Sequence, residues 1–387
     1  MSRIVGDSEP FVPKFPHRRY NPLLDQWIIC SPQRITRPWT GQIEKTTSNT
    51  KSDRSETHPS PVNPLSPGAT RSNGAVNPHY TGTYMFRNDF PALTQIVAEP
   101  ALNASVPSDT ESLSQDPLHA WTSARGDCQV MCFHPQFEKT LALMEHHEVL
   151  RVVDELCEMS KRYMDQKIYR WLQIFENRGA AVGCSNMHPH CQVWACEFLP
   201  SLAERRDFNQ ARYYKERGTP LLLEYARQEE KLIGKPNDRV VIHAKHWLVI
   251  VPWWACWPFE TIIIPRRRHV RWLYELHSDE RDNLADVMQD LLVRYDNLFE
   301  TEFPYTMGWL QAPFPKSSVN CEMEDAATTY PHWQLHAEYQ PPLLRSASVR
   351  KFMSGFEVFA ESQRDLLPEK AAEMLRSAPS IHYTHRS

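Results

Sequence analysis

An internal repeat constrains the fold of this 387-residue chain more than any other feature of its sequence. Each copy has the pattern strand, strand, amphipathic helix, strand, loop, strand. For the first copy, the pattern predicts strands near 129–134, at 171–176 and at 191–198, and a helix with apolar residues at Val149, Val152, Val153, Leu156 and Tyr163. For the second copy, it predicts strands at 247–251, 261–264, 305–309 and 333–339, and a helix from Ser278 with apolar residues at Leu284, Val287, Met288, Leu291, Leu292, Tyr295 and Leu298. Such a duplication predicts two α+β halves joined edge to edge or face to face.

Most links between these strands are short, which favours antiparallel sheets, because parallel strands need a long crossover connection. We expect an N-terminal half at residues 1–240 and a C-terminal half at residues 241–387, the latter with a closing helical segment at 347–375. Two stretches of the first half, 42–79 and 104–116, are rich in polar and turn-forming residues and poor in apolar ones. They are predicted to be long loops.

Charge and hydropathy exclude several classes of partner. The formal net charge is -4, so neither a nucleic-acid backbone nor an anionic membrane is expected as the main partner. The most apolar stretch, 247–264, contains Pro252, Pro258 and Glu260 and is interpreted as two buried strands rather than a membrane helix. The nine cysteines lack CxxC spacing, and no apolar signal region opens the chain. Together these features predict reduced thiols and a cytoplasmic location.

The stretch CSNMHPHCQVWA, residues 184–195, carries the most specific chemistry. Residues two apart on a strand share a face, so His188, His190, Gln192 and Trp194 are expected on one side, with the residues between them facing the core. Histidine is the side chain most ready to act as a nucleophile or base near neutral pH. This face is therefore the first candidate for a reactive site.

The loop before this stretch is suited to an anion. Gly179 and Gly183 allow backbone N–H groups to turn toward a phosphate, and Asn177, Arg178 and Ser185 add donors. An imidazole beside such a cradle can attack phosphorus and form a phosphohistidine-type intermediate. The glutamine can hold a phosphoryl oxygen but donates no catalytic proton, which suits transfer to a second substrate better than hydrolysis. From the residues alone, two other interpretations stay open: a hydrogen-bonded core, and a metal held by the two histidines.

The run from Phe175 to Gln192, FENRGAAVGCSNMHPHCQ, closely resembles the signature of class I galactose-1-phosphate uridylyltransferases, a branch of the histidine triad superfamily. The similarity extends over nearly the whole chain, through NPLLDQWIICSPQRITRPWTG, TYMFRNDFPAL, SARGDCQVMCFHP, FPYTMGW, HWQLHAEYQPPLLRS and VRKFMSGFE. The resemblance implies an α+β fold of duplicated histidine-triad-like halves, with antiparallel sheets forming a half-barrel and helices packed outside.

The resemblance also implies a two-step exchange without a required cofactor. His190 would attack the α-phosphorus of UDP-glucose, release glucose 1-phosphate and hold UMP covalently. Galactose 1-phosphate would then take the uridylyl group and leave as UDP-galactose. Gln192 would bind phosphoryl oxygens in both steps, so Gln192→Arg should cripple turnover, and His188 would orient the site.

Further residues are assigned to substrates by the resemblance alone. They are Asn88 and Asp89 for the ribose, Phe90 and Ser72 for the uridine, Asn177, Gly183, Cys184 and Ser185 for the diphosphate, and Lys351, Glu357 and Gln363 for the hexose. Arg34 and Arg37 resemble arginines that reach the phosphate side of the neighbouring site, which implies a homodimer. The same residues also have purely structural interpretations: an Asx turn at Asn88, a solvated basic loop at the arginines and an exposed helix face at the hexose residues.

The chain departs from the family at the metal positions. Many members hold one metal with a CxxC pair and two histidines. Here those positions carry Asn63, Ser66, Phe137 and His188, and a lone imidazole does not make a tetrahedral zinc site. A second site uses a glutamate and three histidines. Here those positions carry Arg206, Leu310, His336 and Glu338. We therefore expect a metal-independent enzyme, with Arg206 either paired to Glu338 in place of the ion or simply at the surface.

A second departure lies on the sugar side. Phe356 stands where the family often has tyrosine, which removes one hydroxyl donor near the sugar phosphate. Two alternatives therefore accompany the main prediction: a related nucleotidyltransferase of the triad superfamily with another sugar phosphate, and a non-catalytic nucleotide-sugar binder. A binder would gain thermal stability from UDP-glucose without any exchange activity.

Overall fold

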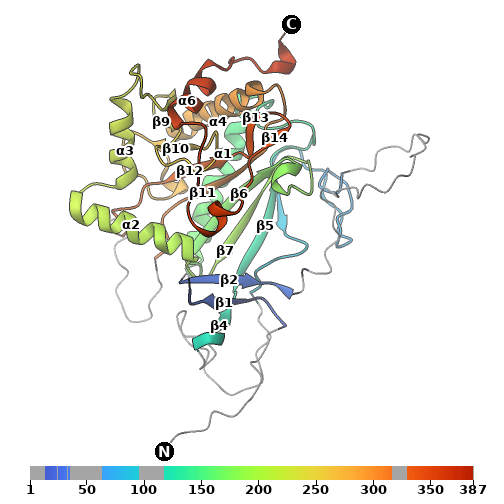
Figure 1. The fold of residues 1–387 in the computed structure, drawn as a ribbon. Helices are drawn as coiled ribbons and strands as arrows, with labels where there is room; N and C mark the ends of the chain where they lie inside the picture. Colours follow the sequence, from blue (N-terminus) through green and yellow to red (C-terminus); the bar gives the residue numbers. More distant parts are fainter. Residues whose placement is uncertain are drawn as a thin grey trace, which may run out of the picture.

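An open, nine-stranded sheet forms the centre of the molecule (Figure 1). The protein is described here from a computed structural model, which covers residues 14–23, 25–32, 34, 63–95, 117–315 and 329–386. The strands lie side by side in the order β3 (Tyr84–Arg87), β5 (Gly126–Cys132), β7 (His190–Cys196), β6 (Trp171–Arg178), β11 (Tyr305–Leu310), β12 (His336–Gln340), β10 (Thr261–Pro265), β9 (Trp247–Ile250) and β8 (Val240–His243). Every neighbouring pair is antiparallel, as the short links predicted.

The two predicted repeats are joined edge to edge at the pair β6–β11. Phe175 of β6 pairs with Gly308 of β11. On one side of this pair Gln192 of β7 lies opposite Phe175, and on the other side Glu338 of β12 lies opposite Gly308. The strand order is therefore mirrored about the join, and β7 and β12 are equivalent strands. The predicted α+β class is correct, while the division of the chain at residue 240 stays a prediction.

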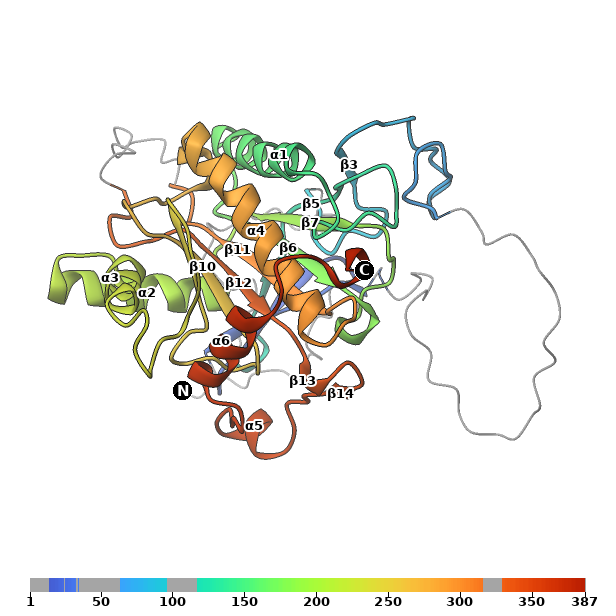
Figure 2. The same ribbon diagram turned by 90° about the horizontal axis from the view of Figure 1, so that it is seen from above.

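Two long helices, α1 (His146–Asp165) and α4 (Ser278–Leu298), lie side by side on one face of the sheet (Figure 2). They begin where the chain supplies caps: the carboxylate of Glu148 accepts the backbone N–H of Glu145 at 2.7 Å. The apolar positions predicted from helical spacing are buried, among them Val149 and Leu291, except Leu298 at the end of α4, which is half-buried. Burial of this stripe against the sheet forms the main core.

Two further helices, α2 (Ser201–Arg217) and α3 (Leu221–Glu230), cover the opposite face of the second half. Leu222 and Ala226 of α3 pack on Ile250 and Ile262, and Arg206 of α2 reaches Glu338 on β12. On the first half, the same face of the sheet carries the half-buried side chains of residues 190, 192 and 194. The candidate reactive face is thus the part of the sheet not covered by α2 and α3.

The remaining elements surround this framework. Those with fully described residues include a three-stranded sheet of β2 (Gln26–Cys30), β1 (His17–Asn21) and β4 (Trp121–Ser123), and the hairpin β13 (Leu343–Ser346) with β14 (Val349–Arg350). They also include the helices α5 (Phe356–Phe359) and α6 (Pro368–Ser377), and 3-10 turns at Pro117–His119, Ala180–Val182, Leu273–Glu275 and Tyr383–His385. The closing segment 347–375 is thus only partly helical, because a hairpin and a turn at Gly355, with φ +43°, precede α5. Within the predicted loop 42–79, the described part forms consecutive turns closed by a bridge between Thr70 and Val76.

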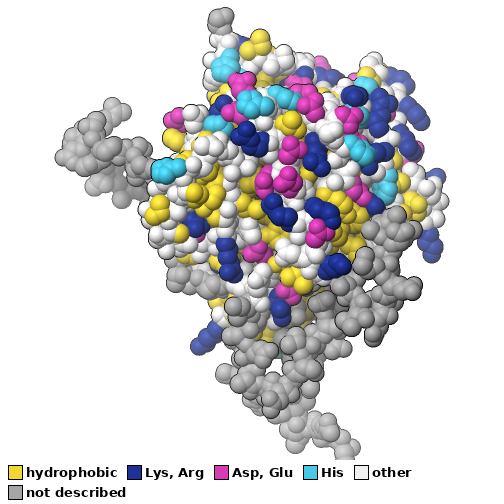
Figure 3. Space-filling model, turned by 180° about the vertical axis from the view of Figure 1, so that it is seen from behind, with side chains coloured by type: hydrophobic (Ala, Val, Ile, Leu, Met, Phe, Trp, Pro, Cys, Tyr) yellow, Lys and Arg dark blue, Asp and Glu magenta, His cyan; other side chains and the backbone are white. Residues whose placement is uncertain are grey.

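The mixture of acidic and basic side chains on the surface agrees with the small net charge of the sequence. Seen from behind, on the side of α1 and α4, acidic and basic side chains are interspersed across the centre of the molecule (Figure 3). In the part of the chain that the structure describes, no helix combines the length and the apolar character needed to cross a membrane.

Candidate active site

His190 opens β7, and its imidazole is oriented by its own backbone. The Nδ1 atom lies 2.6 Å from the carbonyl oxygen of His188. A carbonyl oxygen only accepts hydrogen bonds, so Nδ1 carries the proton and the lone pair of the ring is on Nε2. This is the tautomer that a nucleophilic imidazole needs when it attacks through Nε2.

His188 is buried and fixed in the opposite tautomer. Its Nε2 donates to the carbonyl oxygen of His134 at 2.8 Å, with the hydroxyl of Tyr80 at 3.1 Å. Its backbone N–H donates to the side-chain oxygen of Asn186 at 2.9 Å. Burial lowers the pKa of His188 to about 4, so the ring is neutral near pH 7. His188 therefore acts as a rigid support whose carbonyl oxygen holds His190, and Tyr80, His134 and Asn186 are partners that the sequence did not identify.

The predicted alternation is correct from His190 onward, whereas His188 precedes β7 and is buried rather than presented on the open face. Cys191 and Val193 are buried in the core, while His190, Gln192 and Trp194 are half-buried on the opposite face. Two other predicted residues reach this face. The amide of Asn88 lies 3.5 Å from the side-chain oxygen of Gln192, and the guanidinium of Arg34 lies 5.8 Å from the centre of a Trp194 ring.

The two glycines of the loop between β6 and β7 have positive φ values, but the prediction that the loop turns its N–H groups toward an anion is wrong for Gly183, whose N–H is bonded within the loop. Gly179 and Gly183 have φ values of +88° and +78°, a region that glycine occupies without strain. The N–H groups of Gly183 and Cys184 donate to carbonyls at the start of the same loop, those of Ala180 and Gly179. These two amides therefore shape the loop itself. Asn177 accepts a hydrogen bond from the hydroxyl of Thr306 at 3.2 Å and so lies at the join of the two halves.

Three of the residues predicted for the nucleoside, Asn88, Asp89 and Phe90, follow β3 directly. Asn88 forms an Asx turn by accepting the backbone N–H of Phe90 at 2.9 Å, and it also contacts Gln192. Asp89 pairs with Arg71 at 2.9 Å, and burial raises the pKa of its carboxyl group while Arg71 opposes this shift. Ser72 is exposed in a turn that precedes β3, next to Arg71. Arg37 lies outside the described residues.

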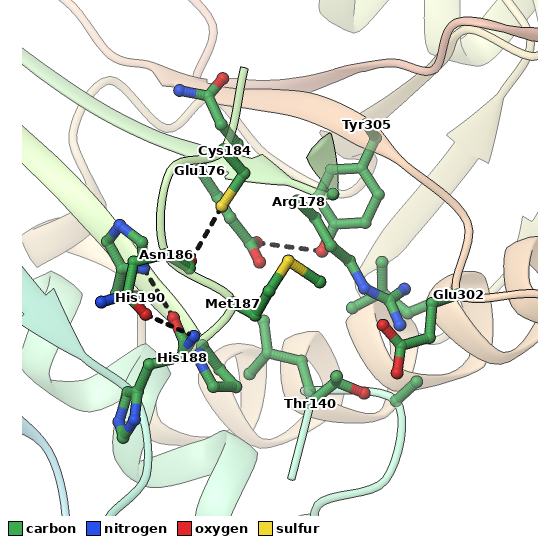
Figure 4. Close-up of a pocket in the computed structure, with 16 residues that line it drawn as sticks. Thr140, Glu176, Arg178, Cys184, Asn186, Met187, His188, His190, Glu302 and Tyr305 are labelled. Atoms are coloured by element: carbon green, nitrogen blue, oxygen red, sulfur yellow. Dashed lines mark hydrogen bonds between the residues drawn. The ribbon is translucent and has the colours of Figure 1, made fainter. Parts of the chain in front are cut away.

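A pocket lies between the 184–190 loop and the helical layer (Figure 4). His188 and His190 lie at one end, while Glu176 and Arg178 lie beyond Met187. Burial raises the pKa of the Glu176 carboxyl to about 7. The carboxyl accepts a hydrogen bond from the hydroxyl of Tyr305 at 3.0 Å. Arg178 is held by both carboxylate oxygens of Asp296, at 2.7 and 2.8 Å, which stiffens the strand leading into the loop.

The residues predicted for the hexose gather in a cluster of their own after β14. Glu357 bonds the amine of Lys351, accepts the backbone N–H of Gln363 at 2.9 Å and lies 3.6 Å from Arg364. The hydrogen bond from Lys351 is the main reason that the pKa of Glu357 is lowered. Phe356 is 67% exposed.

The positions that the sequence resemblance assigns to metals carry residues that do not fit a metal. Phe137 is exposed, and Asn63 bonds Asn186 instead of a cation. At the second position Arg206 donates to Glu338 at 2.9 Å, so the predicted pair is formed. Within the described ranges, no three His, Cys, Asp or Glu side chains gather in a way that could hold a metal ion. At the first position His188 is the one imidazole among the described side chains, and at the second the guanidinium of Arg206 stands where a ligand would be needed. Neither position therefore supplies the four ligands of a tetrahedral metal centre.

Comparison with known proteins identifies the fold and the family. Residues 11–200 match the family described as galactose-1-phosphate uridyl transferase, N-terminal domain, and residues 206–387 match its C-terminal domain. Galactose-1-phosphate uridylyltransferase of Rattus norvegicus is 50% identical over 368 residues, covering 95% of this chain and 89% of the rat protein. The protein of the same name from Haemophilus influenzae is 44% identical over 372 residues, covering 96% of this chain and 97% of its own.

A solved structure of a uridylyltransferase has the same fold, with a TM-score of 0.71 at 22% identity, over 93% of this chain and 97% of that one. The two family matches together span nearly the whole sequence, and the curated relatives align over almost their full length. The chain therefore belongs to the galactose-1-phosphate uridylyltransferase family.

Proposed function

We propose that this protein exchanges UMP between UDP-glucose and galactose 1-phosphate through a covalent uridylyl-histidine at His190. One observation supports this proposal above the others: the Nδ1 proton of His190 is bound by the carbonyl oxygen of His188 at 2.6 Å, so the lone pair lies on Nε2. In the first step Nε2 forms a bond to the α-phosphorus, and the bond from that phosphorus to the bridging oxygen breaks. Glucose 1-phosphate leaves with the electron pair of that bond.

In the second step a phosphate oxygen of galactose 1-phosphate attacks the same phosphorus, and the phosphorus–nitrogen bond breaks. The Nδ1 proton stays on the ring throughout, so the positive charge that develops on the imidazole faces the His188 carbonyl. Gln192 donates its amide to a phosphoryl oxygen. Because an amide does not protonate a leaving group, the site favours a second phosphate over water as the acceptor.

The remaining assignments follow the sequence prediction. Asp89 and Asn88 bind the ribose, since a carboxylate accepts two hydroxyl protons, and Ser72 and Phe90 flank the base. The diphosphate lies along the loop residues Asn177, Gly183, Cys184 and Ser185, where the Gly183 and Cys184 amides shape the loop. The hexose is bound by Lys351, Phe356, Glu357 and Gln363. No metal or other cofactor takes part in these steps, and one zinc or iron ion per chain in purified, active protein would contradict this assignment.

We further propose that the working form is a cytoplasmic homodimer whose arginines Arg34 and Arg37 complete the neighbouring site. Three aromatic residues near the hexose cluster are exposed: Phe352 at 68%, Phe356 at 67% and Phe359 at 90%. Apolar surface of this kind is typical of a region that a partner covers. The test mixes two inactive variants, His190→Ala and Arg34→Ala, after reversible dissociation. Shared sites regain activity in the mixture, whereas an Arg34 that serves only its own chain, beside Trp194, gives none.

The primary experiment incubates the purified protein with UDP-glucose alone and measures its intact mass under mildly alkaline conditions, in which a phosphoramidate survives. Wild type should gain the mass of one uridylyl group, and His190→Ala should gain nothing. Wild type that binds UDP-glucose tightly and forms no adduct would instead identify a nucleotide-sugar binder. Galactose 1-phosphate added to the adduct should then release UDP-galactose.

A further inference from the structure

The residues from Asn63 to Tyr80, here called the 63–80 segment, form a compact unit held by their own polar groups. Asn77 is 2% exposed, and its amide donates to the carbonyl oxygens of Pro64 and Ser66 at 2.9 and 3.0 Å. The hydroxyl of Tyr80 donates to the carbonyl oxygen of Leu65 at 2.6 Å. These bonds hold the turns of the segment together from within.

One side of the 63–80 segment is hydrogen-bonded to the loop that leads into β7, the strand that begins at His190. Asn63 and Asn186 exchange reciprocal amide hydrogen bonds of 2.8 and 3.1 Å. The Asn186 oxygen also accepts the backbone N–H of His188, whose carbonyl oxygen in turn binds His190 Nδ1. Tyr80 contacts the ring of His188 at 3.1 Å. A continuous chain of hydrogen bonds therefore runs from Asn63 to the nucleophilic imidazole.

The other side of the segment is bound to the residues after β3. Arg71 pairs with Asp89 at 2.9 Å, and the same nitrogen lies 3.3 Å from the carbonyl oxygen of Arg87. The guanidinium lies 4.2 Å from the ring centre of Phe86, a buried residue of β3. The Arg71 and Asp89 side chains are 11% and 12% exposed, so solvent screens this ion pair little.

We propose that the 63–80 segment is a positioning element that couples the nucleoside-binding carboxylate of Asp89 to the nucleophile His190. Asn63 and Arg71 are its two positioning residues: Asn63 sets the His188 carbonyl and thereby the direction of the His190 ring, and Arg71 fixes Asp89 to the same unit. The proposal rests on the proposed roles of His190 and Asp89. Its consequence is that a uridine ribose held at Asp89 finds the imidazole already aligned for attack.

The test measures the single-turnover release of glucose 1-phosphate from UDP-glucose in wild type, Asn63→Ala, Tyr80→Phe and Arg71→Gln. The burst amplitude measures the number of correctly folded sites. The burst rate measures how well the His190 imidazole is aligned with the α-phosphorus. Asn63→Ala is expected to keep the amplitude and the dissociation constant of UDP-glucose while the rate falls about 10- to 100-fold. The Asn63→Ala, Arg71→Gln double variant should lose less than the product of the two single effects, because both act through one element.

The control is Val76→Ala, which shortens a side chain of the same segment that is 65% exposed. It should behave as wild type. An unchanged rate with a lower amplitude or melting temperature in Asn63→Ala and Tyr80→Phe would assign the segment a packing role and overturn the proposal. Nitrogen-15 spectra of labelled histidines give an independent readout: Asn63→Ala should lose the single Nδ1–H tautomer of His190, and an unaltered tautomer would also overturn it. In a further outcome, wild type releases no burst of glucose 1-phosphate while Asn63→Ala still changes the tautomer of His190. That result would reject the proposed transfer reaction and leave the coupling in place.

Discussion

His190 and His336 occupy equivalent places in the two halves of the sheet and are held in the same way. Each ring places Nδ1 against the carbonyl oxygen two residues earlier, at 2.6 Å in His190 and 2.9 Å in His336. They differ in what covers them. His190 is half-buried on the uncovered face, whereas His336 is 3% exposed and its neighbour Glu338 is engaged by Arg206 from α2. The duplicated fold thus builds two imidazole positions, and α2 closes the second.

Replacing Gln192 by arginine is expected to reduce UMP exchange by at least about 100-fold. Gln192 lies opposite Val130 and Phe175, and its side chain lies 3.5 Å from Asn88. A longer, charged side chain at this place displaces the neutral amide donor. Steady-state exchange measures the effect, with the melting temperature as a control for folding. Activity close to wild type would show that Gln192 does not bind the reacting phosphoryl group.

His188 should make the protein sensitive to acid. Its pKa is lowered by burial from 6.5 to about 4, so between these values the unfolded chain binds a proton that the folded chain does not. The free energy of unfolding therefore falls as the pH decreases through this range, by about 2 kcal/mol between pH 7 and pH 5. Urea denaturation at the two pH values, compared with His188→Gln, checks this. An equal pH dependence in the variant would assign the effect to other groups.

His146 should contribute with the opposite sign. Its Nε2 lies 2.9 Å from Asp282 and its Nδ1 lies 2.8 Å from Asp286, so both nitrogens donate and the ring is an imidazolium that ties α1 to α4. The hydrogen bond to Asp282 is the main cause that raises its pKa above 6.5. This stabilisation is complete below pH 6.5 and is lost as the pH rises through the raised pKa. The stability difference between wild type and His146→Gln should therefore shrink from pH 6 to pH 9, and a constant difference would contradict the clamp.

Arg206 and Glu338 should be coupled in stability. The two side chains are 36% and 21% exposed, so the pair lies between a surface and a buried salt bridge. Arg206→Gln is expected to cost about 1–2 kcal/mol, because among the described side chains it leaves Glu338 the more distant His336, at 3.7 Å. A double-mutant cycle with Glu338→Gln measures the coupling by urea denaturation. A coupling energy near zero would mean that the contact does not hold α2 to the sheet.

The sequence by itself determined the elements whose signal is periodic. The apolar spacing in α1 and α4 and the alternation in β7 each reflect burial on one face of a regular element, so they can be read within about 20 residues. The same local pattern placed His190 and Gln192 on one face. The duplication also predicted two halves, since each copy repeats the same order of elements.

Tertiary structure alone decided the edge-to-edge join at β6 and β11, the covering of His336 by α2, and the contacts that orient the nucleophile. Asn63 and Asn186 are 123 residues apart, and Arg71 and Asp89 meet across a turn and a strand. Polar contacts of this kind leave no period in the sequence, because they depend on single atoms brought together by the packing of separate segments. The reactive residues can therefore be found from the sequence, whereas the groups that hold them in position appear only when the chain is folded.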